Sequence, residues 1–127
     1  MEIGSLILTL NKSTTTEGIC ENEHGVLIGI PKVFSYSEPD LTIELYYGLY
    51  QGEWVGWHKI VGKTWGVSYC PHVSWILRFD SLVRATDFQL PLLYHRAMGF
   101  DWPGQKPEKK AYNNFLEKYN RWRNMVI

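Results

Sequence analysis

Five consecutive residues near the N-terminus bring together side chains that can bind a metal ion or exchange protons. They are Cys20, Glu21, Asn22, Glu23 and His24. A protein zinc site normally draws three or four cysteine, histidine or carboxylate ligands from spaced pairs. The remaining histidines of the chain form no second pair of that kind, and no CxxC occurs. We therefore expect a solvated polar loop here, with no metal site and no cofactor.

A thiol and an imidazole also stand close together in Cys70-Pro71-His72. Cysteine nucleophiles are activated by a neighbouring histidine, so this pair could support covalent catalysis. The proline between them, at the end of an expected strand, gives the ring no reason to face the sulfur. We expect Cys70 to be a small, half-buried structural residue, and both cysteines of the chain to remain reduced.

The C-terminal range 106–123 carries six basic and two acidic residues and interleaves them with aromatic rings. Cations beside stacking rings are typical of nucleic-acid recognition. Here the rings recur at helical steps of three and four residues, so the cations fall on the opposite side of a helix. We expect the rings to pack in the core, and we keep nucleic-acid binding as the alternative. Its candidate contacts are Lys110, Lys118, Arg121 and Arg123.

Composition limits both of these interpretations. The 127 residues are 45% hydrophobic and carry 13 basic against 13 acidic side chains, which argues against attachment to nucleic acid by bulk charge. The charge is uneven, because residues 1–63 sum to −4 and residues 64–127 to +4. No GxSxG, P-loop, GxGxxG or HExxH motif occurs, and no secretion signal or membrane-spanning run is found. We expect a cytoplasmic protein that is not an enzyme.

Three strand-like runs in the middle of the chain position the remaining candidates. The runs 41–50, 53–61 and 64–70 are separated by Gln-Gly and Gly-Lys dipeptides, and each dipeptide suits a two-residue hairpin turn. Turns that tight fix the register, so that Tyr50 opposes Glu53. In the second hairpin, Val61 then opposes Thr64. We predict a three-strand antiparallel meander over residues 41–70.

One face of this meander carries mostly large apolar side chains and is predicted to face the core. Its cross-strand sets are Ile43-Ile60-Trp65, Leu45-His58-Val67, Tyr47-Gly56-Tyr69 and Leu49-Trp54. A lone histidine on such a face is usually a hydrogen-bonded structural residue. If His58 instead borders a cleft, it is the best candidate for acid/base chemistry. A small enzyme built around His58 is our second alternative.

The opposite face of the meander carries the aromatic patch that we favour as a binding surface. Its members are Tyr46, Trp57 and Tyr50, with Glu44 and Lys59 beside them. Tyrosine and tryptophan are over-represented where proteins dock, because they bring a large contact area and a polar group. The competing interpretation is that the N-terminal strands or a helix cover this face as a second core layer. Both interpretations have equal support.

The segments after the meander indicate helices. The range 74–85 fits both helix and strand, and we favour a helix. Asp87 is predicted to cap a short helix Phe88–Met98, which Gly99 ends. Pro107 suits the first turn of a final helix. The apolar stripe of that helix is Tyr112, Phe115, Tyr119, Trp122 and Val126.

The segments before the meander indicate more strands. Ser5–Leu10 and Gly25–Ile30 are strand-like, and the polar stretch between them is either a long connection or a ragged extra strand. We therefore expect one α+β domain over residues 1–127, β-rich to residue 70 and helical from residue 74. An antiparallel sheet of about five strands would be packed by two or three C-terminal helices.

The preferred functional hypothesis is a non-enzymatic protein that recognises another protein, as a small inhibitor or accessory subunit does. A small, neutral, motif-poor and aromatic-rich chain is typical of such proteins, including those that phages and mobile elements encode. The expected contacts are the Tyr46 and Trp57 face of the meander and, next to it in rank, the basic face of the last helix.

Overall fold

The computed structural model describes residues 18–67, 71–99 and 107–127, and these form an α+β fold. The strands are β1 (Cys20–Glu21), β2 (Leu27–Ile28), β3 (Lys32–Glu38), β4 (Leu41–Tyr50), β5 (Glu53–Gly62), β6 (Gly66–Val67) and β7 (Arg78–Phe79). The helices are α2 (Leu82–Ala97) and α3 (Lys109–Val126). The strand expected over Ser5–Leu10 lies outside the described residues.

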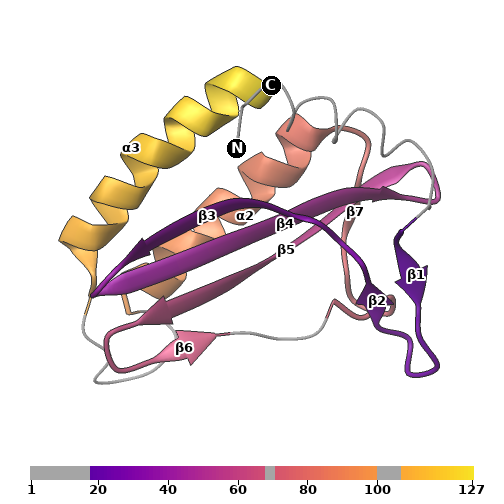
Figure 1. Ribbon diagram of the computed structural model, residues 1–127, viewed down its shortest axis with the longest axis horizontal. Coiled ribbons are helices and arrows are strands. Elements are labelled where there is room, and N and C mark those ends of the chain that lie inside the picture. Colours follow the sequence, from indigo (N-terminus) through magenta and orange to yellow (C-terminus); the bar gives the residue numbers. More distant parts are fainter. Residues whose placement is uncertain (1–17, 68–70, 100–106) are drawn as a thin grey trace.

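The main sheet is antiparallel and has the strand order β3-β4-β5-β6, with β7 paired to another part of β5. Both helices lie on one side of this sheet (Figure 1), where α2 packs mainly on β5 and α3 packs on β3 and β4. Strands β1 and β2 form a separate hairpin at one end of the molecule. The predicted fold class is confirmed.

The hairpin of β4 and β5 has the predicted register. Tyr50 pairs with Glu53, and the ten cross-strand pairs run from there to Leu41 and Gly62 without a break. The turn residues 51 and 52 take left-handed φ values of 54° and 81°, as a tight two-residue turn requires. The predicted core face has no exposed side-chain surface at Ile43, Leu45, Tyr47, His58 and Ile60.

The second hairpin has a longer loop than predicted. Val61 pairs with Gly66 and not with Thr64, so four residues form the loop instead of two. The indole of Trp65 lies against Gly62, where an added Cβ would come within 2.2 Å of the ring, and Gly62 N–H donates to the Trp65 carbonyl at 2.7 Å. Because the register moves by two residues, Val67 stays on the predicted face, now opposite Ile60.

Strand β3 was not among the predicted strands. Aromatic and polar side chains alternate from Phe34 to Glu38, and Pro39 and Asp40 form the turn into β4. A bulge near Val33 interrupts the alternation where the strand begins. The predicted strand over residues 25–30 shortens to β2, and the ragged segment before it supplies β1 as its partner.

Helix α2 begins earlier than predicted. Ser81 is its N-cap, and the Ser81 hydroxyl accepts the Arg84 N–H at 3.2 Å. The prediction that Asp87 caps the helix is therefore wrong, and Pro91 stands inside the helix. The predicted end is confirmed, because Gly99 follows the last turn with a left-handed φ of 82°.

The helix favoured over residues 74–85 is likewise wrong in its first half. Residues 78 and 79 form β7, which pairs with Trp54 and Val55 of β5. Three consecutive apolar residues, Trp75, Ile76 and Leu77, precede β7, so the sequence shows no alternation here. The segment is extended because it finds a partner in β5, and pairing of this kind overrides local propensity.

The predicted stripe of helix α3 is confirmed at Tyr112, Phe115, Tyr119 and Trp122, which are buried. Its predicted start is wrong, because the helix begins at Lys109 and Pro107 precedes its first turn. The rings of Phe115, Tyr119 and Trp122 pack around Phe34 of β3, with ring centroids 5.5–6.1 Å apart. This aromatic layer fastens α3 to the sheet. Of the described helices, neither is both long and apolar enough to cross a membrane.

The other face of the sheet is partly covered by a second, smaller core. Its buried residues are Ile19, Leu27, Ile30, Tyr50, Val55 and Ile76. Gly48 makes room for it, because a Cβ there would lie 2.6 Å from Ile19 Cδ1 and 3.1 Å from Pro31 Cδ. This face is therefore covered over Tyr50, whereas Tyr46 and Trp57 stay partly exposed.

Candidate functional site

A pocket of about 180 Å³ opens between strand β5, the segment before β7 and helix α2. We call it the aromatic pocket. Among the described residues of its lining, Gln89 of α2 has the one amide side chain, and the others are apolar or tryptophan. The lining residues are Gly56 and Trp57 from β5, Trp75, Ile76, Leu77 and Phe79 from the segment, and Phe88, Gln89 and Leu92 from α2.

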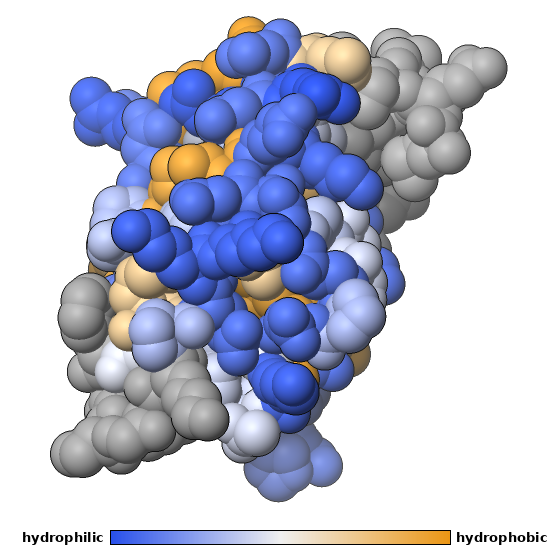
Figure 2. Space-filling view, turned by 90° about the vertical axis from the view of Figure 1, so that its left-hand side faces the viewer, coloured by the Kyte–Doolittle hydropathy of each residue, from blue (hydrophilic) through white to orange (hydrophobic). Residues whose placement is uncertain are grey.

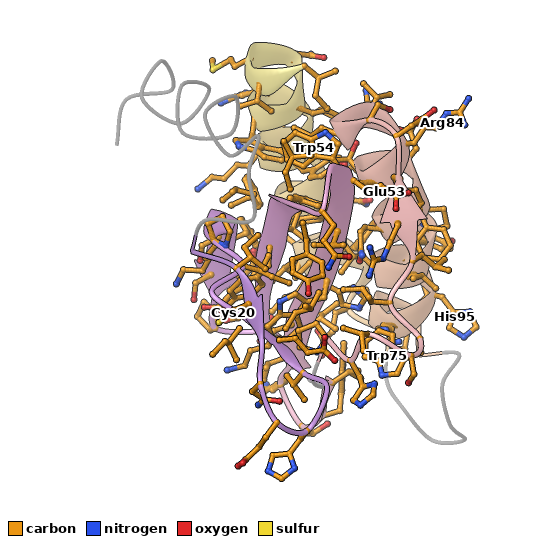
Figure 3. The ribbon with its side chains drawn as sticks, turned by 90° about the vertical axis from the view of Figure 1, so that its right-hand side faces the viewer. Cys20, Glu53, Trp54, Trp75, Arg84 and His95 are labelled. Carbon is orange, nitrogen blue, oxygen red and sulfur yellow. The ribbon has the colours of Figure 1, made fainter. Side chains whose placement is uncertain are left out.

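The mouth of the aromatic pocket exposes large apolar side chains. The exposed fractions are 46% for Trp75, 50% for Leu77 and 40% for Phe88. Figure 3 shows Trp75 beside α2, toward the end of the helix where His95 projects. The rings of Phe79 and Phe88 are in contact, with centroids 5.4 Å apart, so wall and mouth form one apolar surface. Contiguous exposed apolar surface is typical of binding sites.

Gln89 is hydrogen-bonded to His58 of strand β5. The side chain of His58 is fully buried, and its Nδ1 lies 2.5 Å from Gln89 Oε1. Arg96 donates its Nε–H to His58 Nε2 at 3.0 Å. Because arginine offers no acceptor, Nε2 carries no proton and Nδ1 carries it instead. His58 is thus a neutral imidazole with both nitrogens bonded and no exposed surface, an arrangement that gives no support to an acid/base role.

The predicted aromatic patch forms an ordered cluster next to the pocket. The rings of Tyr46 and Trp57 stack at 4.5 Å and 16°, and Trp57 also lines the pocket. The Tyr46 hydroxyl donates to Glu44 at 2.9 Å, and Lys32 Nζ lies 3.4 Å from the same carboxylate. Burial alone would raise the pKa of Glu44, but hydrogen bonds from Tyr46 and Lys32 and the charges of Lys32 and Lys59 lower it. Burial, followed by the Glu44 carboxylate, raises the pKa of Tyr46.

Tyr50 does not share this cluster. Only 6% of its side chain is exposed, because it belongs to the second core. The Arg78 guanidinium lies over its ring, 5.4 Å from the centroid, and also donates to Gln51 at 3.1 Å. The structure therefore brings Tyr46, Trp57, Glu44 and Lys59 together across β4 and β5. Tyr50 is buried in the second core, against which Tyr46 and Trp57 also pack.

The four cations of the nucleic-acid alternative have separate surroundings on α3. Lys110 is exposed. The other three have partners on this chain: Arg123 with Asp87 at 2.6 Å, Arg121 with Glu117 at 2.7 Å, and Lys118 over the Tyr36 ring at 5.4 Å. Figure 2 views the molecule from the side where α3 begins, and the surface there is mostly hydrophilic. Partners already present reduce the charge that these side chains can offer to phosphates.

The polar loop at residues 20–24 is the turn of the β1–β2 hairpin. Asn22 Oδ1 accepts the N–H groups of His24 and Val26 at 2.9 Å and 3.0 Å. Cys20 is an exposed free thiol. In the parts of the chain that the structure describes, no group of three or more histidine, cysteine or acidic residues could hold a metal ion.

His72 is hydrogen-bonded to the same hairpin. Its Nδ1 accepts the Ser74 N–H at 3.0 Å, so Nε2 carries the proton and donates to the His24 carbonyl at 2.8 Å. The imidazole considered as a partner for Cys70 is thus engaged in loop structure, and Cys70 itself lies outside the described residues.

The pocket residues Trp75, Leu77, Phe88 and Gln89 were not predicted as site residues. The wall of the pocket is the uninterrupted apolar run Trp75-Ile76-Leu77, whose periodicity does not distinguish a strand from a helix. Gln89 carries no signal in the sequence either, because its partner His58 stands 31 residues away.

No protein-family model, no curated protein and no solved structure matches this chain.

Proposed function

We propose that this protein is a non-enzymatic binding protein, an inhibitor or accessory subunit, that docks another protein over the aromatic pocket. The observation that carries the proposal is the apolar mouth, where Trp75, Leu77 and Phe88 each leave 40–50% of their surface exposed around one pocket. Most of the binding energy of a protein interface comes from a few large side chains that fill such pockets.

The size of the pocket favours an anchoring side chain over a free cofactor. Pockets for drug-sized ligands usually enclose about 300–1,000 Å³. The aromatic pocket holds about 180 Å³, which is room for a single side chain. A ligand anchored by so small a group needs further contacts outside the pocket, and a protein partner supplies them.

Two ion pairs lie next to strand β7, which adjoins the pocket. Asp80 and Arg84 form an exposed ion pair at 3.4 Å, and Arg78 and Glu53 form another at 3.8 Å. Protein interfaces combine an apolar centre with a polar, solvent-accessible rim. Because both signs of charge occur beside the same segment, this surface has the composition of such an interface.

Trp57 joins the pocket to the Tyr46 cluster, which extends the proposed surface along the sheet. One side of the Trp57 ring stacks on Tyr46, and the residue also forms part of the pocket lining. Glu44 and Lys59, opposed across β4 and β5, lie beyond it. The proposed surface therefore runs from the pocket mouth to the predicted patch.

Affinity capture with two arginine variants tests the proposal. Leu77→Arg places a charge at the pocket mouth, and the matched control Met125→Arg places the same charge at the end of α3. The native side chains are 50% and 52% exposed, so both variants should fold, which thermal unfolding would verify. Each tagged protein would be used as bait in extract of its native cell, with quantitative mass spectrometry of what it retains.

We expect one saturable protein partner whose recovery falls about tenfold or more with Leu77→Arg. Its recovery with Met125→Arg should equal that of the wild-type bait. A partner retained equally by the Leu77→Arg bait would overturn the proposed surface. The proposal of a protein-binding function would be overturned if no protein were enriched saturably by the wild-type bait.

A further inference from the structure

The aromatic pocket has room for one six-membered ring. Its volume is about 180 Å³, and an apolar cavity of about 150 Å³ in another protein is known to bind benzene. Trp57, Trp75 and Phe88 supply aromatic walls. Aromatic side chains favour offset-stacked or edge-to-face contacts with another ring, so the walls suit an aromatic guest.

Gln89 turns its amide nitrogen, and not its oxygen, toward this guest. Arg96 donates to His58 Nε2, which leaves the imidazole proton on Nδ1, and Nδ1–H can bond only to the oxygen of Gln89. The opposite orientation of the amide would place two donors face to face. His58 and Arg96 are therefore positioning residues that decide which group the pocket presents.

The Gln89 amide nitrogen is a hydrogen-bond donor at the pocket. Only 5% of the Gln89 side chain is exposed, and the residue lines the pocket. Among the residues that the structure describes, its Nε2 has no hydrogen-bond partner and is not sealed away from the pocket. A donor that reaches an apolar pocket gains a hydrogen bond when the guest brings an acceptor.

The three aromatic side chains differ in what they offer this donor. Phenylalanine has no acceptor, and the indole of tryptophan has only an N–H donor. The phenol oxygen of tyrosine accepts, and its own hydrogen can rotate toward water at the open mouth. Of the three, tyrosine alone meets both requirements of the pocket, a ring of the right size and an acceptor at its edge.

We infer that the aromatic pocket takes one tyrosine side chain of the partner, whose phenol oxygen accepts a hydrogen bond from Gln89. The inference rests on the proposed function, because it names the group by which the partner is recognised. It assigns a role to Gln89 in selecting the anchor residue, and to Trp57, Trp75 and Phe88 in holding its ring.

Side-chain analogues test the inference without the partner. The full chain, labelled with ¹⁵N, would be titrated with p-cresol, toluene and 3-methylindole, which represent the tyrosine, phenylalanine and tryptophan side chains. The indole N–H signals of Trp57 and Trp75 and the amide NH₂ signals of Gln89 would report binding. We expect p-cresol to bind about fivefold more tightly than toluene, the worth of one neutral hydrogen bond. 3-Methylindole should bind no more tightly than toluene.

Gln89→Leu should abolish the preference, so that p-cresol and toluene bind this variant with equal dissociation constants. Because this variant leaves the Nδ1–H of His58 without a partner, the double variant His58→Leu with Gln89→Leu provides a second background in which both partners are apolar. Leu116→Ala is the control, since Leu116 lines a different groove, between α2 and α3. It should alter neither dissociation constant.

Three results would overturn the inference. They are equal binding of p-cresol and toluene to the wild-type chain, a preference that persists in both Gln89 variants, and no response of Trp57 or Trp75 at the solubility limit of the probes. Capture of a partner that depends on Leu77 would still support protein docking in those cases. Conversely, p-cresol could show a Gln89-dependent preference while no partner protein is captured. That result would support the aromatic pocket as a site for a phenol ring and would refute the proposed function.

Discussion

His58 and Gln89 share a hydrogen bond of 2.5 Å that ties strand β5 to helix α2. The imidazole is fully enclosed, and the bond from Arg96 fixes its tautomer. The pair lies between the core and the aromatic pocket, so it contributes both to the stability of the fold and to the chemistry that the pocket presents.

Replacement of His58 by alanine should destabilise the protein by about 3 kcal/mol, because it opens a cavity and removes the hydrogen-bond partner of the buried Gln89 oxygen. Urea unfolding would measure the change in the free energy of unfolding. The matched control is His24→Ala in the exposed hairpin turn, where a change within about 0.5 kcal/mol is expected. A loss below about 1 kcal/mol for His58→Ala would contradict the hydrogen-bonded arrangement.

Gly62→Ala should disturb the β5–β6 hairpin, because the added Cβ would meet the Trp65 ring at 2.2 Å. Displacement of a large, well-packed ring costs about 2 kcal/mol in the free energy of unfolding. Gly66→Ala is the control in the same hairpin, since its Cβ would make only ordinary contacts of 3.5 Å and beyond. Equal melting temperatures for the two variants would show that Trp65 does not lie over Gly62.

Alkaline pH should destabilise the protein through Tyr112. Burial, followed by the nearby Tyr119 and Tyr94, raises the pKa of Tyr112 to about 12. An unfolded chain ionises tyrosine near pH 10, so below about pH 10 both states are protonated and the contribution is fully present. Between about pH 10 and 12 the unfolded state loses its proton first, and the free energy of unfolding falls by roughly 1 to 2 kcal/mol from this group.

Unfolding experiments at several alkaline pH values would measure this decline, and Tyr112→Phe should make it shallower. At neutral pH the variant should differ little from the wild-type chain, because the Tyr112 hydroxyl makes only a long hydrogen bond of 3.5 Å to the Leu90 carbonyl. Parallel declines for both proteins would refute the raised pKa.

Two arginines of α3 should contribute differently to the free energy of unfolding. Arg123 bridges to α2, where its Nη2 lies 2.6 Å from Asp87 Oδ1 and its Nε donates to Thr86 Oγ1 at 3.3 Å. Among the described residues, Arg121 pairs with Glu117 of its own helix, and the side chains of both residues are well exposed. We expect Arg123→Ala to lower the free energy of unfolding by about 1 kcal/mol and Arg121→Ala by about 0.3 kcal/mol. The reverse order would contradict the bridge.

Local patterns predicted the parts of the fold that local physics determines. The Gln51-Gly52 turn, with alternation on both sides of it, was enough for the whole β4–β5 register. The helical stripe of α3 was enough for its packing face. The two-residue loop at Gly62 failed because the packing of the Trp65 ring, which no turn pattern contains, decided the loop length.

The pocket could not be predicted for the same reason. Whether residues 75–79 form a strand or a helix depends on the edge of β5, with which β7 pairs. Pairing of this kind overrides local propensity. The placement of His58 on the core face was correct, but nothing in the sequence pairs it with Gln89. The partner stands 31 residues further along, on a helix whose start was itself misplaced.

Ile76 connects the pocket to the small hairpin of β1 and β2. It lines the pocket and at the same time belongs to the second core, which a hairpin with strands of only two residues helps to close. Elements with so few ladder bonds open by local unfolding more often than the main sheet does. Each opening would withdraw one wall of the pocket, so a guest that keeps the wall in place must also slow amide exchange in the hairpin, by the reciprocity of linked equilibria.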